Sequence, residues 1–366
     1  MIDIAPRNAP AAVAPPLTAG DPAPWFIAPS DANERFQLST VGGRRVLVSF
    51  LPSLSSGEGK LIVDQLLAGA GRFSKNTAGM LIFSADANDR GLSVPPDVSG
   101  VRFLYDPELV VAKLYGVTDE GNLRPTTFLI NERLRIVAVS PVRTAEGHAA
   151  IVYDLYDRFG PMEPSSRAHP QAPVLIVPNV FEPAFCKTLI DGYVEHGGQE
   201  SGFMVERDGK TVLEHDHAHK RRSDWVLTDQ RLIDAARYRI RRRIGPEIQR
   251  AYQFHVSRIE RYLVACYEAE ADGHFSPHRD NTTRGTAHRR FAVSINLNDD
   301  YDGGDLVFPE FGRVHFRPPP GGACVFSCSL LHEATKVVRG TRYVFVPFLY
   351  DEAAKLVRDE NLGSLA

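Results

Sequence analysis

Two histidines and one aspartate in the C-terminal half have the residue types and spacing of a metal site. His278 and Asp280 are two positions apart, and His332 follows fifty-two positions after Asp280. On a strand, alternate residues share a face, so His278 and Asp280 can reach one point. With His332 arriving from another strand, the set leaves three positions open on an octahedral ion, the design of non-haem Fe(II) oxygenases. Taken alone, either histidine is as readily an ordinary surface or hydrogen-bonded side chain as a metal ligand. Only the combination of all three residues favours a metal site.

Arg342, ten positions after His332, is the candidate anion binder. If it faces inward on a strand, its charge is buried and costs several kcal/mol unless an anion pairs with it. A dicarboxylate that also chelates the metal would remove that cost, because a guanidinium binds a carboxylate through two parallel hydrogen bonds. If Arg342 instead faces solvent, Arg339 is the fallback, although its place before Gly340 indicates a loop.

The elements that must position these residues belong to a two-domain chain. Residues 1–17 are rich in Pro and Ala without periodicity, which predicts a disordered arm. Residues 160–173 contain four prolines among small polar residues and are interpreted as a linker. The two domains are therefore expected at 18–159 and 174–366.

The first domain alternates strands with helical segments. Val46–Leu51 and Thr126–Ile130 are apolar strand patterns, whereas Lys60–Leu67 and Glu108–Leu114 have helical spacing. This alternation predicts an α/β layer fold with a mainly parallel sheet.

The second domain begins with helices and continues with short strands. Helical patterns cover Pro183–His196 and Arg231–Phe254, and strand patterns with glycine-rich turns dominate from Val256 onward. We therefore expect an α+β domain in which helices pack on a β-sandwich such as a jelly roll.

Composition excludes several classes of protein. The 366 residues carry a net charge of -3, which argues against nucleic-acid binding by bulk charge. No run of 18 apolar residues indicates a transmembrane helix, and the N-terminal residues lack the pattern of a secretory signal. Four cysteines are too few for a disulfide scaffold. A cytoplasmic protein with no membrane or nucleic-acid partner is expected.

The C-terminal half carries a family resemblance. Arg261–Tyr350 resembles the 2-oxoglutarate- and Fe(II)-dependent dioxygenases of the prolyl 4-hydroxylase-like type, through CYEAEADGHFSPHRDN, INLNDDYDGGDLVFPEFG, PGGACVFSCSLLHEATKV and RGTRYVFVPF. Residues 174–254 look like the helical part of that family. The resemblance implies a double-stranded β-helix (jelly roll) core.

The resemblance also implies roles for six residues. Fe(II) would be bound at the catalytic centre by His278, Asp280 and His332. The co-substrate 2-oxoglutarate would be bound by Arg342 through its distal carboxylate, with Tyr267 and Asn296 lining its pocket. Asn296 is the weaker of these assignments.

The implied reaction is oxidative. With O2, 2-oxoglutarate is decarboxylated to succinate while a C–H bond of an amino-acid-like substrate is hydroxylated, with ascorbate as an optional reductant. That substrate would be a prolyl or other residue in a peptide or protein, or a small molecule. Related halogenases lack the carboxylate ligand, so the presence of Asp280 favours hydroxylation. The alternative is a non-catalytic oxygen- or metabolite-sensing protein or a redox adaptor.

Residues 18–159 resemble a peroxiredoxin-type thioredoxin fold through GDPAPWFIAPS, RRVLVSFLPSLSS and RPTTFLINERLRIV. Pro125 falls where such folds have a cis-proline, and Arg124 where peroxiredoxins have an active-site arginine. The peroxidatic pattern Pro-x-x-x-Thr-x-x-Cys is Pro52, Ser56 and Gly59 here, and no cysteine precedes residue 186.

Peroxide reduction needs a thiolate, so the first domain is not expected to be a peroxidase. Docking, substrate presentation or homodimer formation is the expected role of this domain.

Three histidines in EHDHAHKRR form a weaker signal. On one strand face, His215, His217 and His219 would make a second metal site, whereas the simpler interpretation is a solvated hairpin near the active-site mouth. A third interpretation is that Lys220, Arg221 and Arg222 meet an acidic group of the substrate.

Overall fold

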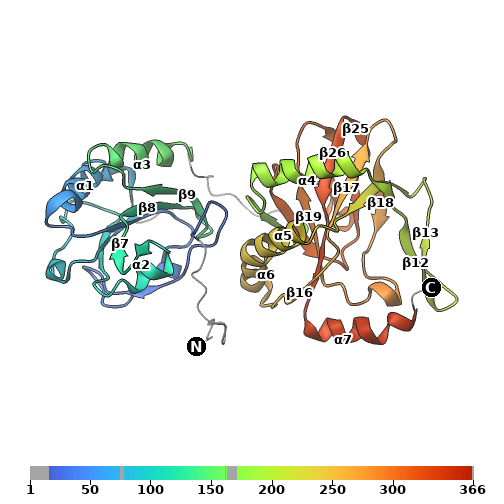
Figure 1. The fold of residues 1–366 in the computed structure, drawn as a ribbon, viewed down its shortest axis with the longest axis horizontal. Coiled ribbons are helices and arrows are strands. Elements are labelled where there is room, and N and C mark those ends of the chain that lie inside the picture. The colour runs from blue at the N-terminus through green and yellow to red at the C-terminus, as the bar shows by residue number, and fades with distance from the viewer. Residues whose placement is uncertain (1–15, 75–77, 161, 163–170, 365–366) are drawn as a thin grey trace. The chain divides into compact units, whose positions relative to one another are not determined.

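The computed structural model of the chain describes residues 16–74, 78–160, 162 and 171–364. The chain divides into two compact units, residues 1–165 and 166–366 (Figure 1). Nearly all of the arm expected at 1–17 and most of the linker expected at 160–173 lie outside the described residues. None of the described helices is both long and apolar enough to cross a membrane.

The elements of the first unit are β1 (Ile27–Ala28), β2 (Phe36–Gln37), β3 (Arg45–Leu51), α1 (Gly57–Ala68), β4 (Ala78–Ser84), β5 (Val101–Tyr105), α2 (Val110–Leu114), β6 (Thr118–Asp119), β7 (Asn122–Leu123), β8 (Thr126–Ile130), β9 (Ile136–Pro141) and α3 (His148–Asp157).

The main sheet of the first unit is buried on both faces. Its strand order within the described residues is β5-β4-β3-β8-β9. Along β3, Val46, Val48 and Phe50 contribute to the core that includes α2, whereas Leu47 and Leu51 contribute to the core that includes α1 and α3. This alternation explains the continuous apolar run, because successive side chains point to opposite faces. The thioredoxin-like α/β fold is thereby confirmed.

Two details of the first unit differ from the prediction. The sheet is mixed, since β8 and β9 run antiparallel to their neighbours; the short turn between them permits only a hairpin. No described peptide bond is cis, so the expected cis bond before Pro125 is wrong. The trans form is the ordinary state of an X–Pro bond, and in it the Pro125 carbonyl accepts a hydrogen bond from Val142 N–H at 2.9 Å. Arg124 is exposed and donates to the Gly116 carbonyl at 2.9 Å.

Gly59, which occupies the position of the peroxidatic cysteine, has no room for a side chain. It lies in α1, and a Cβ atom there would meet the Ser53 carbonyl oxygen at 2.0 Å. The segment that contains Ser53 is held by Asp89, which accepts hydrogen bonds from Leu54 N–H at 2.5 Å and from Ser53 Oγ at 3.1 Å. The backbone is therefore closed against a thiol at this position.

We predict that Gly59→Ala lowers the free energy of unfolding of the first unit by roughly 1–3 kcal/mol, the usual cost of overpacking. Gly71→Ala is the matched control, because a Cβ at Gly71 meets nothing within 4 Å. Chemical denaturation monitored by circular dichroism measures both variants. Equal stability of the two variants would show that the Ser53 segment moves freely.

The elements of the second unit are β10 (Leu175–Val177), α4 (Pro183–His196), β11 (Gln199–Glu200), β12 (Phe203–Arg207), β13 (Lys210–Glu214), β14 (Lys220–Arg221), β15 (Ser223–Val226), α5 (Gln230–Arg243), α6 (Gly245–Tyr252), β16 (Arg258–Glu260), β17 (Leu263–Glu268), β18 (His274–His278), β19 (Phe291–Asn296), β20 (Asp302–Gly303), β21 (Leu306–Val307), β22 (His315–Phe316), β23 (Ala323–Ser327), β24 (His332–Ala334), β25 (Val337–Arg339), β26 (Thr341–Phe345), β27 (Phe348–Tyr350) and α7 (Glu352–Glu360).

Two antiparallel sheets form the jelly roll of the second unit. The larger has the path β10-β23-β19-β26-β17-β15-β11, with β16 and β27 attached, and the smaller has the order β14-β18-β24-β21-β22. Helices α4 and α5 contribute apolar side chains to the same core as one face of the larger sheet (Figure 1). The expected helix Arg231–Phe254 is broken between α5 and α6 at Gly245-Pro246, because proline is tolerated only in the first turn of a helix.

Alternation along the larger sheet decides which side chains face the interior of the jelly roll. On β26, Phe345 belongs to the helix-side core and Val344 to the core shared with β17 and β24. Arg342 has the same parity as Val344 and therefore faces inward. The same rule turns Tyr267 of β17 inward, together with Ser294 and Asn296 of β19.

Candidate active site

The three predicted metal ligands meet at the ends of two inner strands of the smaller sheet. His278 ends β18, His332 begins β24, and their Cα atoms are register partners. Asp280 lies beyond the end of β18, so the expectation that one strand carries both members of the pair is wrong for Asp280. Its position is held by a hydrogen bond from its backbone N–H to the Cys328 carbonyl at 3.0 Å.

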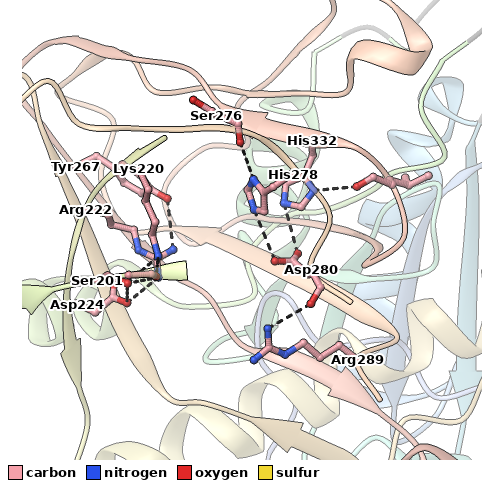
Figure 2. Close-up of polar contacts among 12 residues, drawn as sticks. Ser201, Lys220, Arg222, Asp224, Tyr267, Ser276, His278, Asp280, Arg289 and His332 are labelled. Carbon is pink, nitrogen blue, oxygen red and sulfur yellow. Dashed lines mark hydrogen bonds and ion pairs between the residues drawn. The ribbon is translucent and has the colours of Figure 1, made fainter. Parts of the chain in front are cut away.

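The side chains of the triad converge on one point (Figure 2). Asp280 Oδ1 lies 3.7 Å from His278 Nε2, and Asp280 Oδ2 lies 3.4 Å from His332 Nε2. Each imidazole Nδ1 is 2.8–3.0 Å from a backbone carbonyl, that of Ser276 for His278 and that of Leu330 for His332. These carbonyls accept from Nδ1–H, so the lone pair of each Nε2 faces the common point.

Protonation in this site also suits a metal. Burial, and then the neighbouring His332, lowers the pKa of His278 to about 3, so this imidazole is neutral at physiological pH. Burial alone would raise the pKa of Asp280, but the two histidines and Arg289 hold it below its usual range. Among the described residues, this is the one group of three His, Cys, Asp or Glu side chains whose ligand atoms lie within 4.8 Å of one another. Two imidazoles and one carboxylate fit a divalent transition metal.

Arg342 is buried on the larger sheet, facing the same cavity. It is 3% exposed, and its Nη2 donates to Ser294 Oγ and Asn296 Oδ1, both at 3.1 Å. Its Nε has no hydrogen-bond partner, and no described carboxylate lies within ion-pair distance of it. A buried cation without a counter-ion is costly, so the geometry calls for an anion here. Arg339, the fallback, is exposed and paired with Asp302 at 2.6 Å.

Tyr267 and Asn296 both lie beside Arg342. Tyr267 is the cross-strand partner of Arg342, whose guanidinium carbon lies 5.5 Å from the centre of the phenol ring. Asn296 also donates to the Pro318 carbonyl at 2.8 Å, which fixes its amide so that the oxygen faces Arg342. Ser294 was missed by sequence reasoning, although its parity with Asn296 on a predicted strand was a usable signal.

One cavity of about 620 Å³ contains both the triad and Arg342. It is also lined by Lys220, Arg222 and Asp224 and by residues of the hairpin β12-β13 (Figure 2). Arg222 pairs with Asp224 at 2.6 Å, and Lys220 donates to Ser201 Oγ at 2.8 Å. Of the three residues expected to meet an acidic group of the substrate, Lys220 and Arg222 line the cavity, whereas Arg221 pairs with Asp272.

The second metal site proposed at His215, His217 and His219 is wrong. His217 pairs with Glu200 at 2.6 Å, and His219 packs against Phe203 and Phe275. In the described residues these three histidines do not form a ligand cluster. These histidines lie within the irregular segment between β13 and β14, so the alternation of a strand does not place them on one face.

We predict that Lys220 makes the stability of the metal-free protein depend on pH. Burial, and then Arg222, lowers its pKa from 10.5 to about 6. Between about pH 6 and pH 10.5 the unfolded chain therefore binds one more proton than the folded protein. The free-energy cost of burying Lys220 is absent above about pH 10.5 and complete below about pH 6. Lys220→Met should raise the free energy of unfolding at pH 7 by on the order of a few kcal/mol and by much less at pH 10.

Urea denaturation at both pH values measures this effect, with the exposed Lys187→Met as the control. A stability difference between wild type and Lys220→Met that does not change with pH would contradict the prediction.

Comparisons with known proteins agree with the two units. Residues 262–350 match the model of the 2OG-Fe(II) oxygenase superfamily, and residues 19–139 match that of the AhpC/TSA family. The first unit belongs to the AhpC/TSA family, and the second carries a 2OG-Fe(II) oxygenase domain. Both resemblances expected from the sequence are thus confirmed.

Individual relatives match only one unit each. A protein named as a peroxiredoxin from Mycobacterium tuberculosis is 30% identical over 145 residues, which cover 37% of this chain and 91% of that protein. A PKHD-type hydroxylase from Shewanella frigidimarina is 35% identical over 74 residues, 20% of this chain and 33% of that protein. The chain thus spans about a third of this hydroxylase.

Among solved structures, a prolyl hydroxylase from Trichoplax adhaerens, in complex with a peptide of the hypoxia inducible factor oxygen degradation domain, is 18% identical. The match covers 50% of this chain and 86% of that chain, with a TM-score of 0.38.

Proposed function

We propose that this protein is an Fe(II)- and 2-oxoglutarate-dependent dioxygenase that hydroxylates a C–H bond of an amino-acid-like substrate. The observation that carries the proposal is a buried arginine without a carboxylate partner, Arg342, in the same cavity as the triad of His278, Asp280 and His332. A keto-diacid that chelates the metal and reaches Arg342 would fill open positions on the metal and pair with the guanidinium of Arg342. The similarity to PKHD-type hydroxylases is consistent with this chemistry.

Each residue has a defined part in the proposed reaction. His278, Asp280 and His332 would hold Fe(II), which supplies the redox chemistry that activates O2. Arg342 would bind the distal carboxylate of 2-oxoglutarate, and Asn296 and Ser294 orient its guanidinium. Tyr267 would border the co-substrate on the neighbouring strand. One oxygen atom of O2 would enter succinate as carbon dioxide leaves, and the other would become the hydroxyl group of the product.

Succinate formation tests this proposal. The protein incubated with Fe(II), 2-oxoglutarate, O2 and ascorbate should form succinate, and a substrate screen by mass spectrometry should find a product that has gained one oxygen atom. Ascorbate is proposed only as a reductant that keeps the iron ferrous. No succinate above the iron-free control, with or without candidate substrates, would favour the alternative of a non-catalytic sensor or redox adaptor.

For the first unit we propose a docking, substrate-presenting or dimerisation role in a cytoplasmic protein. This unit has no cysteine, and Gly59 closes the position where a peroxidatic thiol would stand. The four cysteines of the second unit are free and buried, which fits a reducing compartment. Deleting residues 1–160 should change the oligomeric state, solubility or turnover. If the truncated protein keeps its oligomeric state, solubility and turnover, the proposed role of the first unit is contradicted.

A further inference from the structure

A second arginine in the cavity lacks a partner. Three arginines that line the cavity are paired with carboxylates: Arg222 with Asp224 at 2.6 Å, Arg289 with Glu260 at 2.7 Å and Arg279 with Glu310 at 2.6 Å. Arg261 also lines the cavity. Within the described parts of the chain it forms neither a hydrogen bond nor an ion pair, and its buried Nε is unsatisfied.

The backbone is distorted in a way that brings Arg261 into the cavity. Its φ angle is 64°, in the left-handed region, and it interrupts the strand between β16 and β17. Successive side chains of a regular strand point to opposite faces, yet Glu260 and Arg261 line the same cavity. A left-handed conformation at a non-glycine residue costs about 1–3 kcal/mol and is concentrated at functional sites.

The surroundings of Arg261 compensate its charge only in part. Its guanidinium carbon lies 4.3 Å from the centre of the Phe348 ring, and Phe348 also lines the cavity. Glu260, the adjacent carboxylate, is already engaged by His288 at 2.7 Å and by Arg289. Burial, and then Arg289 and Arg222, lowers the pKa of Arg261 to about 10, so it stays protonated at neutral pH.

The co-substrate accounts for only one of the two unpartnered arginines. On the proposed function, the distal carboxylate of 2-oxoglutarate is bound by Arg342 and its keto-acid end by the metal. No negative group of 2-oxoglutarate is then left for Arg261. Among the described residues that line the cavity, five arginines face four carboxylates, so an incoming anion would meet a net positive lining even with Lys220 neutral.

We propose that Arg261 binds a carboxylate of the substrate, so that the substrate class is small carboxylic acids of the amino-acid type. The planar guanidinium offers two parallel donors to a carboxylate, and the Phe348 ring beside it limits the approach. A cavity of about 620 Å³ is of the size that holds small-molecule ligands. This inference rests on the proposed dioxygenase function.

The experiment compares acids with their neutral counterparts. Amino acids and N-acetylated amino acids are assayed beside their primary amides for stimulation of succinate formation above the rate without substrate. The same compounds are tested anaerobically for a rise in the Tm of protein loaded with Fe(II) and 2-oxoglutarate. At least one acid should stimulate turnover and raise the Tm, and its amide should do neither.

Variants then assign the effect to Arg261. Arg261→Gln should raise the KM for the acid about 10- to 100-fold, which matches the loss of a hydrogen-bonded charged pair. It should leave the KM for 2-oxoglutarate within about twofold, and Arg261→Lys should recover part of the loss. Arg231→Gln, at an exposed arginine, is the matched control.

The outcomes separate this inference from the proposed function. Wild-type protein that forms no succinate and binds no 2-oxoglutarate would contradict the dioxygenase itself. If succinate forms but no acid outperforms its amide, or if Arg261→Gln leaves the KM for the acid unchanged, the carboxylate assignment alone is overturned.

Discussion

Replacing Asp280 with alanine is expected to abolish iron-dependent conversion of 2-oxoglutarate to succinate. Asp280 supplies the only carboxylate of the described triad, at 3.4 and 3.7 Å from the two imidazole Nε2 atoms. Without it, only the two imidazoles of the triad remain to hold a divalent cation. Mutating a residue that only orients a metal ligand already lowers metal affinity or activity by about 10- to 100-fold. We therefore expect a loss of more than about 100-fold.

The measurement combines succinate formation with Fe(II) binding on purified protein, and His278→Ala should behave in the same way. Asp191→Asn is the control, since this aspartate is exposed on α4 and paired with Lys187. Circular dichroism should be near that of wild type, because the triad lies at the cavity and not in an apolar core cluster. Normal turnover by Asp280→Ala would mean that the metal is bound elsewhere.

Replacing Arg342 with alanine should raise the KM for 2-oxoglutarate steeply and leave Fe(II) binding largely intact. The guanidinium is 3% exposed and is held by Ser294 and Asn296, so a carboxylate paired with it is shielded from water. Removing one partner of a buried charge pair costs about 3–5 kcal/mol. Since 1.4 kcal/mol is tenfold, the KM should rise by roughly 100-fold or more.

Arg339→Ala provides a matched control three positions away on the neighbouring strand. Arg339 is exposed and paired with Asp302, and such surface pairs contribute about 0–1 kcal/mol. Its KM for 2-oxoglutarate should therefore change by less than about fivefold, and Arg342→Lys should fall between the two alanine variants. An effect of Arg339→Ala equal to that of Arg342→Ala would return the anion site to the fallback residue.

Sequence reasoning reached the elements whose pattern is local. The helix Pro183–His196 and the strand Thr126–Ile130 have the predicted bounds, because apolar spacing and the residues at their ends specify them. Sequence reasoning failed where the backbone turns inside a segment whose residue pattern shows no break. The break at Gly245-Pro246 and the left-handed Arg261 both divide segments that look continuous in the sequence.

By itself, the sequence determined the residue types of the candidate site, their order along the chain, the two fold classes and the absence of a thiol in the first unit. Only the tertiary structure decided that His278 and His332 are register partners and that Asp280 reaches them from beyond the strand. It also decided that Arg342 is buried without a carboxylate and that Arg261 shares its cavity. The reason is that side-chain type and periodicity are properties of neighbouring residues. Strand register, burial and the counter-ion of a charge depend instead on strands that are distant in the chain.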